Sequence, residues 1–427
     1  MRSSTANTGI VDIALESGLL ILQNGGETYR AEETMTSIAS SLGFCDSSAF
    51  VTPTVVMLSI RDQEGKSRTR LQRVSSRTIN LGKIARVNEL SRRLARKSTC
   101  LAIPAFKLAP LASAMLSRIA RSPSHAPQWV ILATAFASFC FSLLFHGSMT
   151  EALIAFVIGA LMRFALFALS PLVLSSFIQA MVGGAIISLL ASCGVALGLI
   201  QSSGNVSIAV LMSLVPGVAI VNAIRDIIAG DLVAGSARVL EAFVIAAGLS
   251  IGAALGLFLF PVPVGYASAI LARPERLSAF ALAFGATASF AYFFHITRYD
   301  LLWASLSGAL GWLVYLWAAE SSLSPISGFF AGALFVGLTA EFFAFFFKKP
   351  ATVYIVPGII PFVPGGGMYE TMLFAVQGDI AAASVTGFNT LSAAASIAVG
   401  IALASSLSRL LSRLGKLVSP LRHLRHF

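Results

Sequence analysis

Long apolar runs follow one another beyond Pro127, and they constrain the fold more than any other feature of the sequence. About ten of them approach or exceed the ~20 residues that a helix needs to cross a bilayer. Only 11% of the 427 residues are charged and 56% are hydrophobic, a composition that a soluble fold could not easily cover. We therefore predict an α-helical membrane protein with about ten transmembrane helices. The expected spans are 129–146, 149–169, 174–200, 206–224, 237–260, 277–295, 299–318, 326–346, 354–376 and 384–408.

Positive charge is concentrated ahead of these apolar runs. Fifteen of the 30 Lys and Arg residues lie between Arg61 and Arg121, where only Asp62, Glu64 and Glu89 oppose them. A stretch of this kind could face nucleic acid or the anionic cytosolic leaflet of a bilayer. Because the rest of the chain is apolar, we expect membrane lipids to be the partner of the basic stretch, and we expect no nucleic acid.

Residues 1–125 have the pattern of a small cytosolic α/β domain. Helices are expected over 11–23, 27–42 and 81–95, and the first should end at the glycines that follow Asn24. The run 50–60 is rich in Val and Thr and is expected to be one strand, paired with 69–74 across a charged turn. The N-terminus has no pattern of a signal peptide, so we expect this domain to stay in the cytosol.

The distribution of Lys and Arg predicts the orientation of the helices. An N-terminus in the cytosol also places the basic tail that begins at Arg409 in the cytosol. Only Arg273 and Arg276 would then lie on the outer side, against the rule. We expect a multi-pass protein of the inner or plasma membrane with both termini in the cytosol. The expected domains are the cytosolic domain 1–125, a first five-helix membrane repeat 126–262, a second 274–410, and a basic tail 411–427.

An internal match at an offset of 148 residues divides the membrane part into these two halves. Pro216-Gly217 followed by Gly230-Asp231 reappears as Pro364-Gly365 followed by Gly378-Asp379, with the same spacing between the pairs. A half with five helices must end on the opposite side of the membrane from where it began. The two halves are therefore predicted to be inverted repeats, an architecture of many secondary transporters.

The two Pro-Gly pairs should interrupt the fourth and ninth helices near the bilayer centre. Proline lacks an amide hydrogen, and the break leaves neighbouring backbone groups unpaired, so a polar cavity is expected beside it. The N–H groups after Pro216 and Pro364 and the positive helix ends would favour a carboxylate. Glycine also allows a ligand to approach the backbone closely. The alternative is that both breaks are ordinary packing kinks. The expected backbone site comprises Pro216, Gly217, Pro364, Gly365, Gly366 and Gly367.

Polar residues inside the expected spans are candidates for substrate binding and proton coupling. Asn222 and Glu370 occupy equivalent positions of the two halves and are assigned to the substrate. Glu341 and Glu370 are assigned to proton transfer, because an ionisable group in a membrane is costly and is by default functional. Glu341 could instead form a salt bridge or lie among the headgroups, and Arg163 could snorkel to the cytosolic surface.

Four charged residues that follow the breaks are assigned to proton coupling or gating. They are Arg225, Asp226, Asp231 and Asp379. The alternative for Arg225 and Asp226 is that they simply pair with each other.

Sequence patterns of soluble catalysis are missing. The chain has no GxxxxGK[ST] phosphate loop, its five histidines lack metal-ligand spacing, and its four cysteines form no CxxC pair. We expect no cofactor, no metal and no enzymatic activity.

Several motifs together resemble the threonine/serine exporter family. The stretch from Asn24 to Thr34, the run from Phe50 to Thr54, and the two Pro-Gly segments carry the resemblance, which covers nearly the whole chain. It implies a single-chain fusion of both modules of that family, exporting threonine or serine and driven by the proton gradient. Relatives that split the modules between two chains are associated with succinate export, so a dicarboxylate substrate remains an alternative. A homo-oligomer is also possible.

The resemblance also marks an N-terminal signature comprising Asn24, Gly25, Glu27, Arg30, Glu33 and Thr54. It would place Glu27, Arg30 and Glu33 on one face of a helix, as a gate or as a remnant of a hydrolase-like site. The simpler interpretation is an i,i+3 ion pair between Glu27 and Arg30 on a solvated helix. A membrane-anchored hydrolase and a lipid-binding scaffold are the alternatives from other functional classes.

Overall fold

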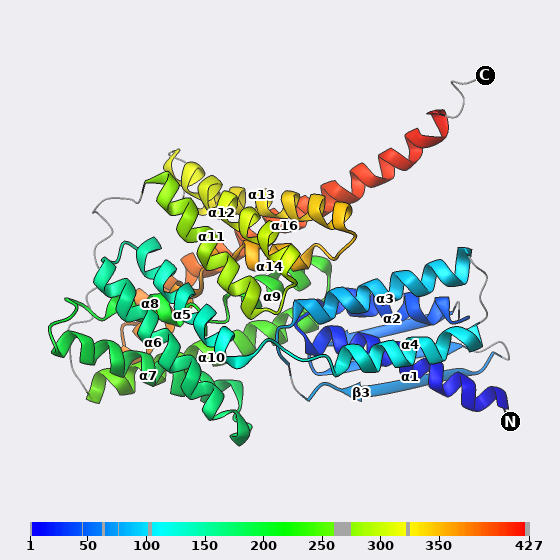
Figure 1. The fold of residues 1–427 in the computed structure, drawn as a ribbon, viewed down its shortest axis with the longest axis horizontal. Coiled ribbons are helices and arrows are strands. Elements are labelled where there is room, and N and C mark those ends of the chain that lie inside the picture. Colours follow the sequence, from blue (N-terminus) through cyan, green and yellow to red (C-terminus); the bar gives the residue numbers. More distant parts are fainter. Residues whose placement is uncertain are drawn as a thin grey trace. The chain divides into compact units, whose positions relative to one another are not determined.

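The computed structural model describes residues 2–44, 46–61, 65–75, 77–100, 105–259, 275–321 and 325–422 (Figure 1). The chain divides into two compact units. Unit 1 takes in 1–125, 226–239 and 294–297, and unit 2 takes in 126–225, 240–293 and 298–427. Unit 1 is thus built from three separate segments of the sequence.

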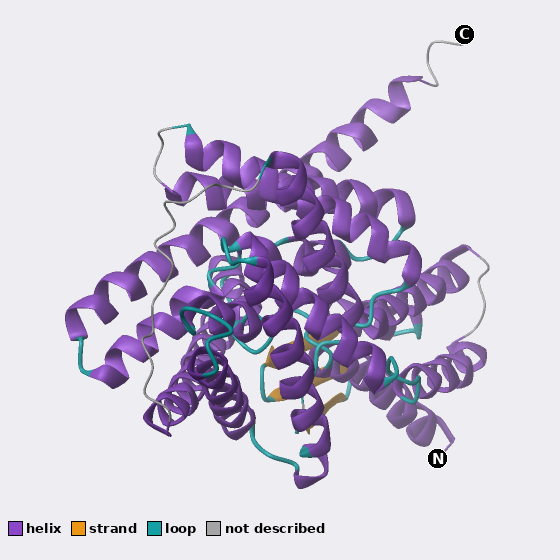
Figure 2. Cartoon of the chain, turned by 60° about the vertical axis from the view of Figure 1, so that its left-hand side comes forward, coloured by secondary structure: helices purple, strands orange, loops and turns teal. Residues whose placement is uncertain are grey.

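Unit 1 contains a three-stranded antiparallel sheet, in the order β1-β2-β3, against which α1 and α2 pack, while α3 and α4 pack against these helices and each other. Alternate residues of β2 are fully buried, among them Val56 and Leu58, so one face of the strand contributes to the core. Figure 2 shows the strands within a chain that is otherwise helix and loop. The elements are α1 (Arg2–Gln23), α2 (Thr28–Ser41), β1 (Ser47–Thr52), β2 (Val55–Arg61), β3 (Ser67–Arg73), α3 (Leu81–Cys100) and α4 (Ala105–Ala120).

The prediction of a single strand over 50–60 is wrong. A tight turn at Pro53 and Thr54 separates β1 from β2, and Thr52 pairs with Val55 across it. Proline has no N–H to donate to a sheet and is excluded from the middle of a ladder, so the chain folds back on itself at Pro53. The run that looked like one strand is therefore a hairpin, and β3 adds to its second strand.

Unit 2 consists of helices and the loops that connect them, with no strand among its described residues. Its elements, together with the parts of α9 and α10 that belong to unit 1, fall into two series with the same order. The first is α5 (Pro127–Leu144), α6 (Met149–Ala168), η1 (Ser170–Leu172), α7 (Ser176–Ala196), α8 (Gly204–Leu211), α9 (Gly217–Ala229) and α10 (Leu232–Leu259). The second is α11 (Arg276–Phe293), α12 (Arg298–Glu320), α13 (Pro325–Phe347), α14 (Thr352–Gly358), η2 (Ile360–Phe362), α15 (Gly365–Gln377) and α16 (Ile380–Arg422).

Helix starts recur at a nearly constant offset between the two series. From α8, α9 and α10 to α14, α15 and α16 the starting residues differ by 148, as in 217 and 365. From α5, α6 and α7 to α11, α12 and α13 they differ by 149, as in 127 and 276. The packing pairs recur as well, since α8 packs on α5 and α6 and α14 packs on α11 and α12. One inserted residue between the third and fourth helices accounts for the change of offset.

Seven helices within the described residues are long and apolar enough to cross a membrane. The count rises to eight if α14–η2 and α15, which meet at an angle of 53°, form one bent span. The chain is therefore a helical, multi-pass membrane protein. The two expected spans outside this count are α11, which begins on Arg276, and the pair α8 and α9, which are short.

Candidate functional site

The first Pro-Gly break separates α8 from α9. The N–H of Val215 bonds to the carbonyl of Leu211 at 2.9 Å and closes α8, and the first bond of α9 runs from the N–H of Ile220 to the carbonyl of Pro216 at 3.1 Å. The amides from Gly217 to Ala219 therefore precede the first helical bond of α9. Such first-turn N–H groups are available to a ligand.

The second break has the same design with a longer interruption. α14 contains Pro357 and ends at Gly358, η2 follows, and Pro364 occupies the position before α15 with φ −77° and ψ 48°. The N–H of Gly365 turns back to the carbonyl of Val363 at 2.7 Å. Here too a proline without an N–H starts the second half-helix.

The two breaks lie directly against each other. A Cβ atom on Gly217 would clash with Cγ1 of Val363 and would lie 3.5 Å from Cα of Gly365. A Cβ atom on Gly365 would lie 3.1 Å from Cγ1 of Val215. The contact is reciprocal, and it explains why glycine follows proline in both copies. Gly366 and Gly367 continue this surface toward Ile208 and Thr390.

The predicted polar residues of the membrane part lie on three different helices. Asn222 is buried in α9, Glu370 is partly buried in α15, and Glu341 is partly buried near the C-terminal end of α13. Pro216, Gly217 and Gly365 are buried, and Pro364 is half-buried.

Two further buried polar residues lie in the half-helices that precede the breaks. Asn205 in α8 is 6% exposed and Thr352 in α14 is 3% exposed. Among the described residues, neither Asn205 Nδ2 nor Thr352 Oγ1 has a hydrogen-bond partner. Sequence reasoning missed both, because Asn205 stands just before the apolar run 206–224 and Thr352 just before 354–376. The available signal in the sequence was a polar residue at the edge of an apolar run.

Arg163 does not snorkel outward. Its Nε donates to Thr134 Oγ1 at 3.3 Å, its Nη2 lies 3.5 Å from the carbonyl oxygen of Ser213, and its guanidinium lies 4.6 Å from the centroid of the Phe293 ring. Ser213 belongs to the first break, so the positive charge of Arg163 contacts one of the carbonyls that the break exposes. The aromatic face provides a second favourable contact for the cation.

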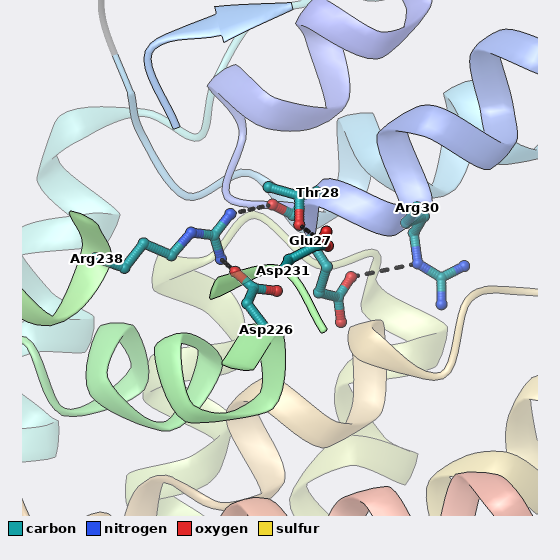
Figure 3. Close-up of polar contacts among 7 residues, drawn as sticks. Glu27, Thr28, Arg30, Asp226, Asp231 and Arg238 are labelled. Carbon is teal, nitrogen blue, oxygen red and sulfur yellow. Dashed lines mark hydrogen bonds and ion pairs between the residues drawn. The ribbon is translucent and has the colours of Figure 1, made fainter. Parts of the chain in front are cut away.

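Unit 1 contains a buried cluster of charges at the start of α2 (Figure 3). α1 ends where Gly25 adopts the left-handed conformation, with φ 88°, and the N–H of Gly26 bonds to the carbonyl of Ile21. This turn places Glu27, which is 2% exposed, at the start of α2, and Arg30 Nε lies 3.3 Å from Glu27 Oε2. The i,i+3 pair is present, but it is buried and not on a solvated helix face.

The segment 226–239 supplies the remaining charges of the cluster, as Figure 3 shows. Thr28 Oγ1 donates to Asp231 Oδ2 at 2.9 Å. Arg238 Nη2 donates to the carbonyl of Gly26 at 3.0 Å, and Arg238 Nη1 lies 3.3 Å from Asp226 Oδ2. Asp226 thus has an ion pair with Arg238. Thr28 and Arg238 were not predicted, because nothing local in the sequence links them to residues about 200 positions away.

The electrostatics of the cluster favour a charged arginine and raise the pKa of a neighbouring glutamate. Burial alone would lower the pKa of Arg30, but the carboxylate of Glu27 outweighs it, with Tyr29 and Glu33 contributing, so that the pKa is raised. Burial raises the pKa of Glu32, the N–H of Val51 opposes this, and the Asp231 carboxylate adds to it. The Asp231 carboxylate therefore disfavours the charged form of Glu32.

The other signature residues make local contacts or lie at the surface. Asn24 Nδ2 donates to the carbonyl of Leu20 at 2.6 Å, while Glu33 is exposed on α2. Thr54 is exposed in the hairpin turn, where its carbonyl accepts from the N–H of Val74. Arg225 is half-buried at the end of α9.

The repeated Gly-Asp pairs are helix ends. Gly230 and Gly378 both have positive φ, 99° and 84°, and in both cases the N–H of the following aspartate bonds back to a carbonyl five residues earlier at 2.9 Å. Asp379 is exposed, and its Oδ1 accepts from the N–H of Ala382 at the start of α16. This geometry is a helix stop followed by a helix start, and glycine is needed for it.

Comparison with known proteins identifies the family. A model described as a threonine/serine exporter matches residues 12–260, more than half of the chain. The chain belongs to the threonine/serine exporter family. A second model of threonine/serine exporters matches residues 279–407. A threonine/serine exporter of Corynebacterium glutamicum is 25% identical over 418 residues, covering 95% of this chain and 83% of the relative. No solved structure matches.

Membership in the threonine/serine exporter family indicates amino acid export and makes the chain a transporter, not an enzyme. The hydrolase alternative for the N-terminal signature is therefore set aside. The first exporter model spans the charge cluster of unit 1 and the first break, and the second spans Glu341 and the second break.

Proposed function

We propose that this exporter moves threonine or serine out of the cytosol, driven by the proton gradient, by alternating access around its two Pro-Gly breaks. The observation that carries the proposal is the reciprocal contact of Gly217 with Val363 and Gly365. It brings the starts of two half-helices together, and two positive helix ends favour one carboxylate between them.

The substrate carboxylate would accept hydrogen bonds from the first-turn amides after Pro216 and Pro364. Asn222 and Glu370 would contact the rest of the substrate, and Glu370 or Glu341 would carry the proton. Both a hydroxy amino acid and a dicarboxylate have a suitable carboxylate. The fusion of both modules in one chain favours the amino acid.

The proposed topology has ten spans in two inverted repeats, both termini in the cytosol and the basic stretch against anionic lipids. The antiparallel course of α5 and α11 supports inversion. Arg163 contacts Thr134 in the first half of α5 and Phe293 at the end of α11, whereas Leu144 at the end of α5 shares a cavity with Arg276 at the start of α11. The composition of unit 1 also supports this topology, since 1–125, 226–239 and 294–297 would all be cytosolic.

In this proposal the charge cluster of unit 1 is a cytosolic gate element. Asp226 lies near the end of α9, the second half of the first broken helix, and Asp231 lies in the turn between α9 and α10. The hydrogen bond from Thr28 and the contacts of Arg238 connect that turn to the signature of the N-terminal domain. A movement of α9 would therefore act on this cluster.

Transport by the purified full chain in proteoliposomes tests the proposal. Vesicles loaded with labelled threonine should release it when a proton gradient is imposed, with serine competing and succinate much less effective. Glu370→Gln should abolish the dependence on the gradient, and the control Glu275→Gln, at an exposed residue outside both breaks, should retain it. Flux that ignores the gradient, or no flux of threonine and serine, would contradict the proposal.

A further inference from the structure

Unit 2 contains a cavity away from the two breaks, with a volume of about 430 Å³. It lies where α5 and α12 end and α11 begins. The residues that matter here are Leu144, His146, Arg276, Trp312, Tyr315 and Glu320. Its volume is within the range of about 300–1,000 Å³ that is typical of small-molecule sites.

The cavity rim carries one charge of each sign. Arg276 Nη2 and Glu320 Oε2 lie 3.6 Å apart, and their side chains are 78% and 35% exposed. An exposed ion pair of this kind contributes little to stability, so a ligand with charges of both signs could replace it at small cost. Arg276 is also a residue that violates the rule of positive charge inside, since the proposed topology places it on the outer side. A role in ligand binding explains its position.

The cavity wall is aromatic and includes two buried nitrogen atoms that make no hydrogen bond to the described residues. The rings of Trp312 and Tyr315 stack at 5.0 Å between centroids. Trp312 is 8% exposed, and among the described residues neither its Nε1 nor Nδ1 of His146 has a hydrogen-bond partner. A buried polar atom without a partner costs free energy, and a ligand or an ordered water could supply the partner after a small shift of the side chains.

An aromatic stack joins this wall to the second break. The ring of Tyr315 is nearly parallel to that of Phe362, at 7° and 5.9 Å between centroids. Phe362 is the last residue of η2 and stands two positions before Pro364. A change in the geometry of the break would therefore act, through Phe362, on the ring of Tyr315 in the cavity wall.

We propose that this cavity is a second binding site for a small zwitterion, a free amino acid, on the outer side of the transporter. The inference rests on the proposed export function and adds a site to it. The carboxylate would contact Arg276, the ammonium group Glu320, and the aliphatic part the faces of Trp312 and Tyr315. A threonine would leave room for ordered water, each molecule taking about 30 Å³.

Binding of threonine to the purified full chain, followed by tryptophan fluorescence, tests this site. Threonine should change the fluorescence, and Trp312→Phe should remove most of the change while keeping the ring stack. Arg276→Gln and Glu320→Gln should each weaken the response about tenfold, the effect of one lost charge-assisted hydrogen bond. The controls Glu275→Gln and Arg298→Gln remove exposed charges that do not line the cavity and should leave it unchanged.

Three outcomes separate this proposal from the export function. Threonine flux with no effect of the Arg276 and Glu320 variants on the fluorescence would overturn the second site alone. Absence of threonine flux, together with a fluorescence response to another free amino acid that these variants weaken, would overturn the proposed substrate and support the site. A response to added phosphatidylcholine but to no free amino acid would mean that the cavity holds a lipid headgroup, and would overturn the site.

Discussion

Thr28 Oγ1 donates a hydrogen bond of 2.9 Å to Asp231 Oδ2 and so joins residues 203 positions apart in the sequence. The bond links the first turn of α2 to the turn between α9 and α10. Arg238 adds a second link through the carbonyl of Gly26. The N-terminal signature is thereby held to the segment that follows the first broken helix.

Thr28→Val should weaken this link without disturbing α2. The substitution removes the donor and leaves a carboxylate oxygen of Asp231 without this bond, which should cost about 1–3 kcal/mol. We expect a lower melting temperature of the purified protein in detergent. Thr36→Val is the matched control, because Thr36 Oγ1 donates to the carbonyls of Glu32 and Glu33 in its own helix. Equal effects of the two variants would mean that the bond to Asp231 contributes nothing.

Arg238→Met should be more damaging than the double variant Arg238→Met with Asp226→Asn. Asp226 is 1% exposed, and removal of its cationic partner leaves a buried carboxylate, which costs about 3–5 kcal/mol. Neutralising the carboxylate should recover part of this loss. A double-mutant cycle on melting temperature measures the recovery, and strictly additive effects would show that the ion pair is not coupled.

Gly217→Ala should abolish threonine efflux, because its Cβ would clash with Val363 in the opposite break. Overpacking of this kind costs about 1–3 kcal/mol and would push the two breaks apart. Gly9→Ala in α1 is the control, since its Cβ would meet nothing within 4 Å and Gly9 lies outside both breaks. Val363→Ala should restore efflux in the Gly217→Ala protein. Failure of this rescue would show that the contact between the breaks is not the cause.

The stability of unit 1 should fall as the pH drops from about 6.5 to about 4. Burial, with His125 and Lys83, lowers the pKa of His295 to about 4, from 6.5 in the unfolded chain. Between these values the unfolded state binds a proton that the folded state does not, so stability rises with pH. His295→Asn should flatten this part of the stability curve, and asparagine tolerates the positive φ of 58° at this position. An unchanged slope in this variant would exclude His295 as the titrating group.

The membrane helices and their two breaks could be predicted from the sequence because their causes are local. Apolar length determines a membrane helix, and proline removes the N–H that a continuous helix needs. Pro53 acts by the same rule, yet the Val and Thr residues around it suggested one strand. The helix α4 lay in a segment to which no structure was assigned.

The contacts of the candidate site could not be predicted, because they join residues with no local relationship. Sequence reasoning placed Arg30 and Asp231 in different parts of the molecule, and nothing near Thr28 or Arg238 indicates a partner. The contacts of Arg163 could not be predicted for a similar reason. Arg163 contacts the carbonyl of Ser213, which is exposed because the helix is broken there. The position of this carbonyl beside Arg163 depends on the tertiary fold.

The contact between Gly217 and Val363 joins two modules that are matched by separate exporter models. In a transporter made of two polypeptides the same contact would be a subunit interface, and its occupancy would depend on the concentration of both chains. Fusion makes the contact intramolecular, at an effective concentration that does not change with expression level. Every copy of this chain therefore carries its own second half, and a cell that makes the protein never holds one half without the other.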